Sequence, residues 1–312
     1  MIAIVRAGRP RSARIQWHAP WGQRFPAALG SASFQVILQG SCWLSPPSGA
    51  PIGLSAGDVV FFSHGHGYGL ADSPATPMAE PTCDPLEDAE LFASASVGGP
   101  EQGTVTVTLC GGYQLDPGRA HPILAHLPDV IHLPAHPGHR PELRAAVDLL
   151  GSEIHQPRLG ADTIVPALLD MLLLYILRTW VDEQPANGAA TGWSAALRDP
   201  ATGAALHAIH SDPSLPWTVE MLGRHAGLSR AAFSHRFRTL VGQPPLTYLT
   251  WWRMTLGARL LRTSDAPVGQ VATRAGYRSE FAFANAFKRA YGTSPGRYRR
   301  RTRLPHQAPY RA

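Results

Sequence analysis

The chain has 312 residues, enough for two ordinary domains, and 44% of them are hydrophobic against 16% charged, which predicts a globular protein and excludes a disordered one. The net charge of +6 is unevenly distributed. Residues 1–200 hold 11 basic and 18 acidic side chains, a net of −7, whereas residues 201–312 hold 17 basic and 4 acidic ones, a net of +13. This asymmetry predicts two modules with different partners.

The number of cysteines and the hydropathy of the chain indicate its cellular compartment. The three cysteines, Cys42, Cys83 and Cys110, are few and odd in number, and no secretion signal precedes them, which indicates a reducing cytoplasm. The most apolar segment, 171–177, is far shorter than the ~20 residues that a membrane span needs. We therefore expect a cytoplasmic protein without a membrane partner, in which residues 171–177 belong to a buried or dimer-forming helix.

Residues 1–136 are predicted to be rich in β-structure. Strand-like runs occupy 33–40, 58–62 and 104–109, and the last of these alternates with the period of two that a half-buried strand shows. The stretch 73–103 is rich in Pro, Gly and acidic residues and is predicted to be a mobile loop. Many short strands separated by Gly and Pro turns favour a barrel or a sandwich.

Helical spacing replaces this pattern in residues 137–200, at 141–154 and again at 162–182. A Gly- and Ala-rich break at 185–192 is predicted to be flexible. We expect the region to be a helical linker that can also form a dimer. The apolar residues that fall on one face of the second segment, and so predict its packing face, are Ile164, Leu168, Met171, Leu172 and Tyr175.

The C-terminal third contains an internal repeat whose copies, at about 218–239 and 267–289, each have the pattern of a helix-turn-helix unit. A small residue in the first helix lets the second helix cross closely, a glycine forms the turn, and a serine caps the second helix. Two phenylalanines four residues apart then face the core. The matched pairs are Gly223 with Ala272, Gly227 with Gly276, Ser229 with Ser279, Phe233 with Phe283, and Phe237 with Phe287.

The opposite face of each second helix is left for a DNA groove. The base-contact candidates are Arg230, Ala231, Ser234 and His235 in the first unit and Glu280, Phe281, Ala282 and Asn285 in the second. Basic side chains supply phosphate contacts, from which much of the affinity for DNA comes. The phosphate-contact candidates are Arg236, Arg238, Arg253, Arg278, Lys288 and Arg289.

The paired units resemble the DNA-binding domain of the AraC/XylS family of transcription regulators. The resemblance covers roughly residues 205–300 and is most specific over 275–299, which begins AGYRSEFAF and ends SPGRYR. It implies a DNA-binding domain over 201–304, followed by a tail at 305–312. Two departures are Asn285, where the family often has arginine, and His235, at a position that is often basic. Asparagine prefers adenine where arginine prefers guanine, so the DNA sequence that is read there should differ.

The resemblance extends, less specifically, to the front of the chain. Residues 57–72 (GDVVFFSHGHGYGLAD), 109–116 and 127–133 are similar to the cupin-like sensory domain of one AraC/XylS branch. A cupin is a small β-barrel with an interior pocket. The implied fold is therefore an α+β multidomain protein with an N-terminal cupin-like β-barrel over 1–136, a helical linker over 137–200 and an all-α C-terminal domain.

Four residues are sensor candidates. His64 and His66 have the spacing of metal ligands on one strand, although the glycines around them favour a polar turn at the barrel mouth, and Tyr68 stands where this branch often has histidine. Cys42 and Cys110 are either buried small hydrophobic residues, which we favour, or thiols that sense oxidants or electrophiles. We predict no metal and no cofactor.

The leading interpretation is a sequence-specific transcription regulator, not an enzyme. Its N-terminal domain would sense a small molecule or redox signal, and its paired helix-turn-helix units would bind double-stranded promoter DNA. RNA polymerase, as for an activator, and a second copy of the chain are further expected partners, and repression remains open. The alternatives are a cupin-type metal enzyme with a DNA-binding appendage and a non-specific architectural DNA binder.

Overall fold

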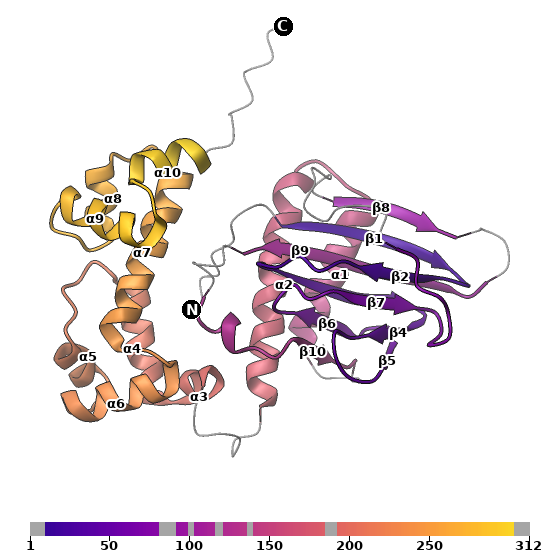
Figure 1. Cartoon of the computed structure of the whole chain (residues 1–312), viewed down its shortest axis with the longest axis horizontal. Helices are drawn as coiled ribbons and strands as arrows, with labels where there is room; N and C mark the ends of the chain where they lie inside the picture. Colours follow the sequence, from indigo (N-terminus) through magenta and orange to yellow (C-terminus); the bar gives the residue numbers. More distant parts are fainter. Residues whose placement is uncertain are drawn as a thin grey trace, which may run out of the picture. The chain divides into compact units, whose positions relative to one another are not determined.

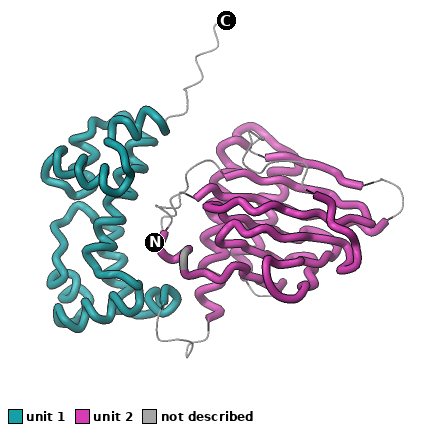
Figure 2. Tube along the Cα trace, in the orientation of Figure 1, with its two compact units in different colours: residues 1, 3, 185–312 teal, residues 2, 4–184 magenta. Residues whose placement is uncertain are grey.

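The computed structural model describes residues 10–80, 92–98, 103–115, 121–135, 140–184 and 192–302. The chain divides between residues 184 and 185 into an N-terminal and a C-terminal compact unit (Figure 2). Cys83, nearly all of the predicted break at 185–192 and the predicted tail at 305–312 lie outside the described residues.

The N-terminal unit contains two β-sheets (Figure 1). The six-stranded sheet has the order β10-β6-β3-β9-β1-β8 and the four-stranded sheet the order β2-β7-β4-β5. All pairings between these strands are antiparallel except β1 with β8. The strands are β1 (Arg11–His18), β2 (Gly22–Phe25), β3 (Ser31–Gln39), β4 (Ser41–Ser45), β5 (Ile52–Ser55), β6 (Val59–Phe62), β7 (Tyr68–Ala71), β8 (Phe92–Val97), β9 (Val105–Gln114) and β10 (Val130–Leu133).

The two sheets enclose a core that large side chains fill, because alternate residues of each strand point inward. On β3, Ile37 contributes to this interior, while Phe34 points the other way and packs against Tyr113 of β9. The prediction of an N-terminal β-barrel is confirmed. Its interior is lined by Trp17, Trp21, Ile37, Cys42, Leu44, Leu54, Val60, Phe62, Tyr68 and Leu70.

Strand β8 corrects the prediction that all of 73–103 is a mobile loop. Residues Phe92–Val97 pair in parallel with β1 at the edge of the six-stranded sheet. The sequence FASASV is dominated by small residues, and four of the six are exposed. A strand of this kind depends on its neighbour for backbone hydrogen bonds rather than on its own propensity, so its residues alone do not indicate it.

Helices α1 (Pro141–His155) and α2 (Ala161–Glu183) lie on one face of the six-stranded sheet (Figure 1) and belong to the N-terminal unit. The predicted linker of 137–200 is therefore divided, since α3 (Trp193–Arg198) belongs to the C-terminal unit. The hydroxyl of Tyr113 on β9 donates to the backbone carbonyl of Leu169 on α2 at 2.6 Å, which fixes the helix to the sheet.

Helix α2 packs through a different face from the one predicted. Of the five predicted residues only Leu172 is buried, and Ile164 is 42% exposed. The helix is apolar on both faces, so periodicity alone could not select the packing face. The face that does pack consists of Ala161, Val165, Leu169, Leu172, Leu173, Ile176, Leu177 and Val181.

The apolar stretch is also longer than 171–177. Helix α2 has 23 residues and a window of mean hydropathy 1.7, enough to cross a membrane by length and composition alone. Of that window, 44% is buried inside the structure, and one helix of this kind is weak evidence for a membrane span.

The C-terminal unit is all-helical (Figure 1). Helices α5 and α6 form the first helix-turn-helix unit, α8 and α9 form the second, and α7 runs between them. The Arg-rich segment that begins at 297 lies in α10, anchored by the fully buried Tyr298. Besides α3, the helices are α4 (Pro200–Ser211), α5 (Val219–His225), α6 (Arg230–Val241), α7 (Pro245–Thr263), α8 (Val268–Arg274), α9 (Glu280–Tyr291) and α10 (Pro295–Thr302).

Local sequence explains where the second helix of each unit begins. Ser229 accepts a hydrogen bond from the backbone N–H of Ala232, and Ser279 accepts one from Ala282, so both serines are N-caps. The turn before α9 contains Gly276 at φ +78°, which favours glycine. The prediction of two helix-turn-helix units in an all-helical C-terminal domain is confirmed.

Candidate nucleic-acid interface

In the first unit, α6 has one buried and one exposed face. Phe233 and Phe237 are buried in the core. Ala231 and His235, one turn apart, lie on the exposed side roughly opposite them. Arg230 and Ser234 lie on the flank of this face, Arg230 exposed and Ser234 half-buried. The helix therefore presents a small residue and an imidazole at the centre of its free face.

In the second unit, α9 repeats this arrangement with different side chains. Phe283 and Phe287 are fully buried, and Phe281, Asn285 and Lys288 lie on the opposite, exposed face. Ala282 is also exposed. Glu280 is exposed too, but its carboxylate turns back toward α8, since an Oε2 atom lies 3.1 Å from the position of a Cβ built on Gly269.

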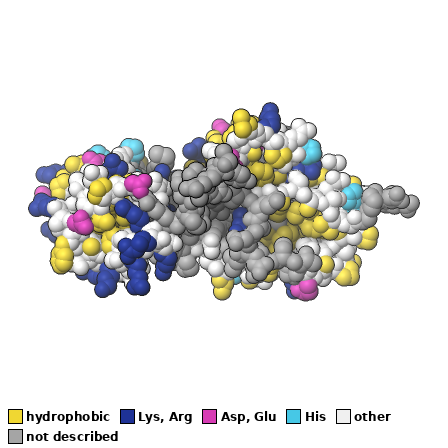
Figure 3. Space-filling model, turned by 90° about the horizontal axis from the view of Figure 1, so that it is seen from above, with side chains coloured by type: hydrophobic (Ala, Val, Ile, Leu, Met, Phe, Trp, Pro, Cys, Tyr) yellow, Lys and Arg dark blue, Asp and Glu magenta, His cyan; other side chains and the backbone are white. Residues whose placement is uncertain are grey.

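Five of the six phosphate-contact candidates have exposed side chains: Arg236, Arg238, Arg278, Lys288 and Arg289. They lie on the two second helices or directly before one. On the face shown in Figure 3, Lys and Arg side chains gather on the C-terminal unit. The structure thus places cationic groups next to the exposed faces of α6 and α9.

Arg236 is turned away from the free face of α6 and toward α3 and α4. Its Nε lies 3.0 Å from both carboxylate oxygens of Asp199, which is the N-cap of α4. Hydrogen bonds from Arg236 and Thr202 lower the pKa of Asp199 to about 2, against the cost of burying the carboxylate. The pair borders an open pocket of about 550 Å³ between α3 and α6. Arg236 is thus committed to an intramolecular ion pair that sequence reasoning missed.

Arg253 also has intramolecular acceptors. From α7, its Nε donates to the carbonyl of Pro213 at 2.8 Å and its Nη2 to that of Leu215 at 2.7 Å. Burial lowers the pKa of Arg253. A Cβ on Gly276 would lie 2.8 Å from the same Nε, so the guanidinium packs onto the turn of the second unit. These contacts favour a structural role for Arg253 over phosphate binding.

The two cysteine candidates lie on different sheets of the barrel. Cys42 on β4 is 2% exposed, and burial together with the nearby Asp58 carboxylate raises the pKa of its thiol to about 12. Such a thiol is almost entirely protonated at neutral pH and reacts slowly with oxidants. Cys110 on β9 is half-buried, with its Sγ 3.5 Å from the carbonyl of Ala13. Neither Cys42 nor Cys110 forms a disulfide within the described residues.

The two histidine candidates lie in the loop between β6 and β7. Nε2 of His64 is 3.0 Å from the carbonyl of Leu127, and Nδ1 of His66 is 3.4 Å from a carboxylate oxygen of Asp129. The two rings are 6.1 Å apart. Within the part of the chain that the structure describes, no group of three or more His, Cys, Asp or Glu side chains could hold a metal ion.

A buried polar pair inside the barrel was not expected from sequence. Nε2 of Gln35 on β3 donates to the hydroxyl of Tyr68 on β7 at 2.9 Å, and Tyr68 stacks on Phe62 with ring centroids 3.7 Å apart. Burial raises the pKa of Tyr68. Gln35 is fully buried, and its Oε1 has no hydrogen-bond partner among the described residues. An unpaired buried acceptor is costly to the folded state.

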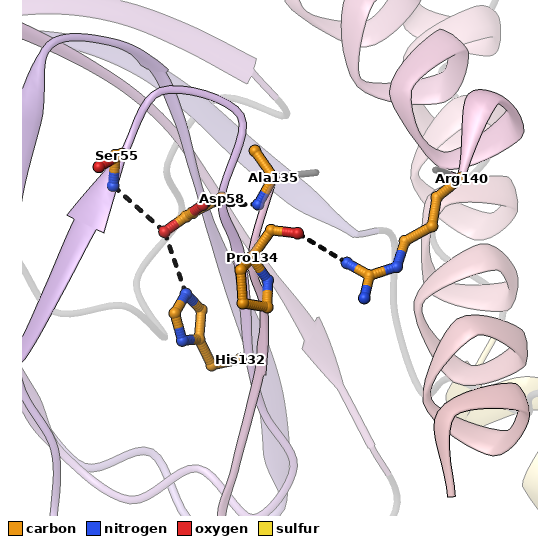
Figure 4. Close-up of polar contacts among 6 residues, drawn as sticks. All are labelled: Ser55, Asp58, His132, Pro134, Ala135 and Arg140. Carbon is orange, nitrogen blue, oxygen red and sulfur yellow. Dashed lines mark hydrogen bonds and ion pairs between the residues drawn. The ribbon is translucent and has the colours of Figure 1, made fainter. Parts of the chain in front are cut away.

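A polar network ties the barrel to the helix pair (Figure 4). Asp58, 6% exposed, accepts from the backbone N–H of Ala135 at 2.7 Å and lies 3.0 Å from Nε2 of His132 on β10. Arg140, at the start of α1, donates to the carbonyl of Pro134 at 2.8 Å and forms an ion pair with Glu183. Its backbone has φ +60°, a conformation that non-glycine residues rarely adopt. The network links β10 to the last residue of α2.

Comparison with known proteins identifies a family for each of the two units. A cupin family model matches residues 1–182, and a helix-turn-helix domain family model matches residues 222–301. A putative AraC-like transcription regulator from Streptomyces lividans is 31% identical over 98% of this chain and 98% of its own length. Another, from Streptomyces antibioticus, is 33% identical over 96% of this chain and 97% of its own length. The solved DNA-binding domain of AdpA, in complex with a target DNA, is 39% identical and covers 33% of this chain and 92% of its own, with a TM-score of 0.32.

A cupin unit followed by paired helix-turn-helix units defines a DNA-binding transcription regulator. The chain belongs to the AraC family of these regulators. Its relatives are regulators and not enzymes, which removes the alternative of a metal enzyme with a DNA-binding appendage.

Proposed function

We propose that the protein binds a two-part promoter site, with α6 and α9 in successive major grooves about 34 Å apart on one side of the DNA. The proposal rests on the exposed faces of α6 and α9, each of which lies opposite two buried phenylalanines. Because both helices belong to one chain, a monomer can occupy both halves of the site.

The two halves of the site should differ in sequence. At matched positions α6 presents Ala231 and His235, whereas α9 presents Phe281 and Asn285. These side chains differ in size and in hydrogen-bonding groups, so they select different base edges. We therefore expect an asymmetric, directional site, which distinguishes the protein from a non-specific architectural binder.

Phosphate binding is proposed for the exposed cations. Arg238, Arg278, Lys288 and Arg289 would position the helices without reading sequence. Arg236 and Arg253 are removed from the proposed set because their guanidiniums are held by Asp199 and by backbone carbonyls.

The N-terminal unit is proposed to sense a small molecule or redox signal. The buried pair of Gln35 and Tyr68 places polar groups inside the barrel, which supports a small-molecule signal. Oxidation of Cys42 is disfavoured by its raised pKa, so Cys110 is the better thiol candidate. Signal binding would act by shifting the balance between DNA-competent and incompetent states.

The network of Figure 4, extended by the ion pair between Arg140 and Glu183, is the proposed route out of the barrel. It runs from Asp58 and β10 through Arg140 to Glu183, and the chain enters the C-terminal unit directly after. The exposed apolar side of α2, with Ile164 at 42% exposure, supports homodimer formation. We also propose that the protein contacts RNA polymerase and acts in the cytoplasm.

Footprinting with base-by-base substitution of the protected DNA tests the central claim. Asn285→Ala should relax base preference in one half of the site only, and His235→Ala in the other half only, each by roughly 1–3 kcal/mol. Gln156→Ala, which removes an exposed amide from the N-terminal unit, is the matched control. A footprint without base preference, or equal effects of both variants on both halves, would overturn the proposal.

A further inference from the structure

Phe281 is 77% exposed at the start of α9. The chain has ten phenylalanines, all within the described residues, and the other nine are buried or half-buried. Exposed single apolar residues are common, but an exposed phenylalanine on the free face of a recognition helix is a specific placement. We propose that its ring contacts the 5-methyl group of a thymine in the DNA site. The inference rests on the proposed entry of α9 into a major groove.

The fold determines which phenylalanine points outward. Phe283 and Phe287 are fully buried, and Phe283 packs so tightly that a Cβ on Gly257 of α7 would lie 2.8 Å from its ring. Phe281 lies two residues before Phe283 and hence on the other side of the helix. It shares that side with Asn285, one turn further on, and with Lys288 after it.

The chemistry of the major groove indicates which base group Phe281 contacts. The thymine methyl is the apolar group that the major groove offers, and phenylalanine is one of the side chains that contact it. Asn285 can bond both the N7 and the N6 of adenine. Four residues of helix span about 6 Å and base pairs repeat every 3.4 Å, so the thymine and the adenine should lie within about two base pairs. Lys288 would hold a neighbouring phosphate.

The requirement for a thymine methyl should be weaker in the other half of the site. The residue of α6 that corresponds to Phe281 is Ala231, whose side chain is a single methyl. It therefore offers much less apolar surface to a base. The requirement for a thymine methyl should be concentrated in the half that α9 contacts.

Uracil substitution measures this contact directly, because replacing one thymine with deoxyuridine removes only the methyl group. The full chain would be titrated against its footprinted site with each thymine replaced in turn. Loss of one buried methyl should weaken wild-type binding about fourfold at one thymine in the α9 half. Phe281→Ala should bind the natural site about fourfold more weakly or worse and show no further loss at that thymine.

Two further variants distinguish loss of the methyl contact from loss of folding. Leu246→Ala removes another exposed large apolar side chain, on α7, and should keep the wild-type response to uracil. Phe281→Leu retains apolar surface and should keep part of the response to uracil. Equal uracil responses in wild type and Phe281→Ala, or no methyl-sensitive thymine in a well-footprinted α9 half, would overturn the inference alone. Absence of any site-specific binding would overturn the proposed function as well.

Discussion

The ion pair between Asp199 and Arg236 should contribute measurably to the stability of the C-terminal unit. Asp199 has two roles that substitution can separate. Its carboxylate accepts the N–H of Thr202 at 2.9 Å as the N-cap of α4, and it binds the guanidinium of Arg236 through both oxygens. Asn at an N-cap is as good as Asp, so Asp199→Asn removes the ion pair alone, whereas Asp199→Ala removes the cap as well.

The magnitude follows from the pKa of Asp199, which falls from 3.8 to about 2. This shift corresponds to about 2 kcal/mol, and the hydrogen bonds from Thr202 contribute to it together with Arg236. The Asp199 side chain is 7% exposed but that of Arg236 is 54% exposed, so solvent screening reduces the contribution to roughly 1 kcal/mol. The cap adds about 1 kcal/mol. We expect Asp199→Asn to cost about 1 kcal/mol and Asp199→Ala about 2 kcal/mol.

Calorimetry of the full chain would measure these losses as changes in the melting temperature of the C-terminal unit. Each kcal/mol should lower that temperature by roughly 4 °C in a domain of this size. Because the folded pKa of Asp199 is depressed, the ion pair stabilises fully above about pH 4, and its contribution is lost as pH falls toward 2. The gap between wild type and Asp199→Asn should narrow over the same range. Equal stability at pH 7, or a gap that does not change between pH 4 and 2, would refute the reasoning.

Three other outcomes are expected. Arg238→Gln should reduce the slope of log affinity against log salt by about 0.9, and Arg236→Gln should leave it unchanged, as read from gel-shift titrations across a salt series. Gly257→Ala should destabilise the C-terminal unit by about 1–3 kcal/mol in urea unfolding, because the added Cβ would lie 2.8 Å from Phe283, and an unaltered midpoint would contradict this. In a variant whose only thiol is Cys42, a pKa of about 12 should prevent alkylation of the folded protein at pH 8, and mass spectrometry should detect the adduct only after unfolding.

The faces of α6 and α9 could be predicted because each depends on short-range spacing. Phenylalanines four residues apart define a buried side, and the exposed side follows from helix geometry. The roles of Arg236 and Arg253 could not be predicted in this way. Their acceptors, Asp199 and Pro213, lie 37 and 40 residues away in sequence, and no local pattern connects them.

By itself, the sequence determined the features whose physics is local: the serine caps, the turn glycines, the buried phenylalanines and the helical segments. Only the tertiary structure decided which face of α2 packs against the sheet, that residues 92–97 pair with β1, and that Arg236 and Arg253 bind acceptors within the C-terminal unit. The reason is that a helix apolar on both sides, a strand of small residues and a surface arginine each have several acceptable partners. Long-range packing selects one of these partners, and the chain's local preferences do not.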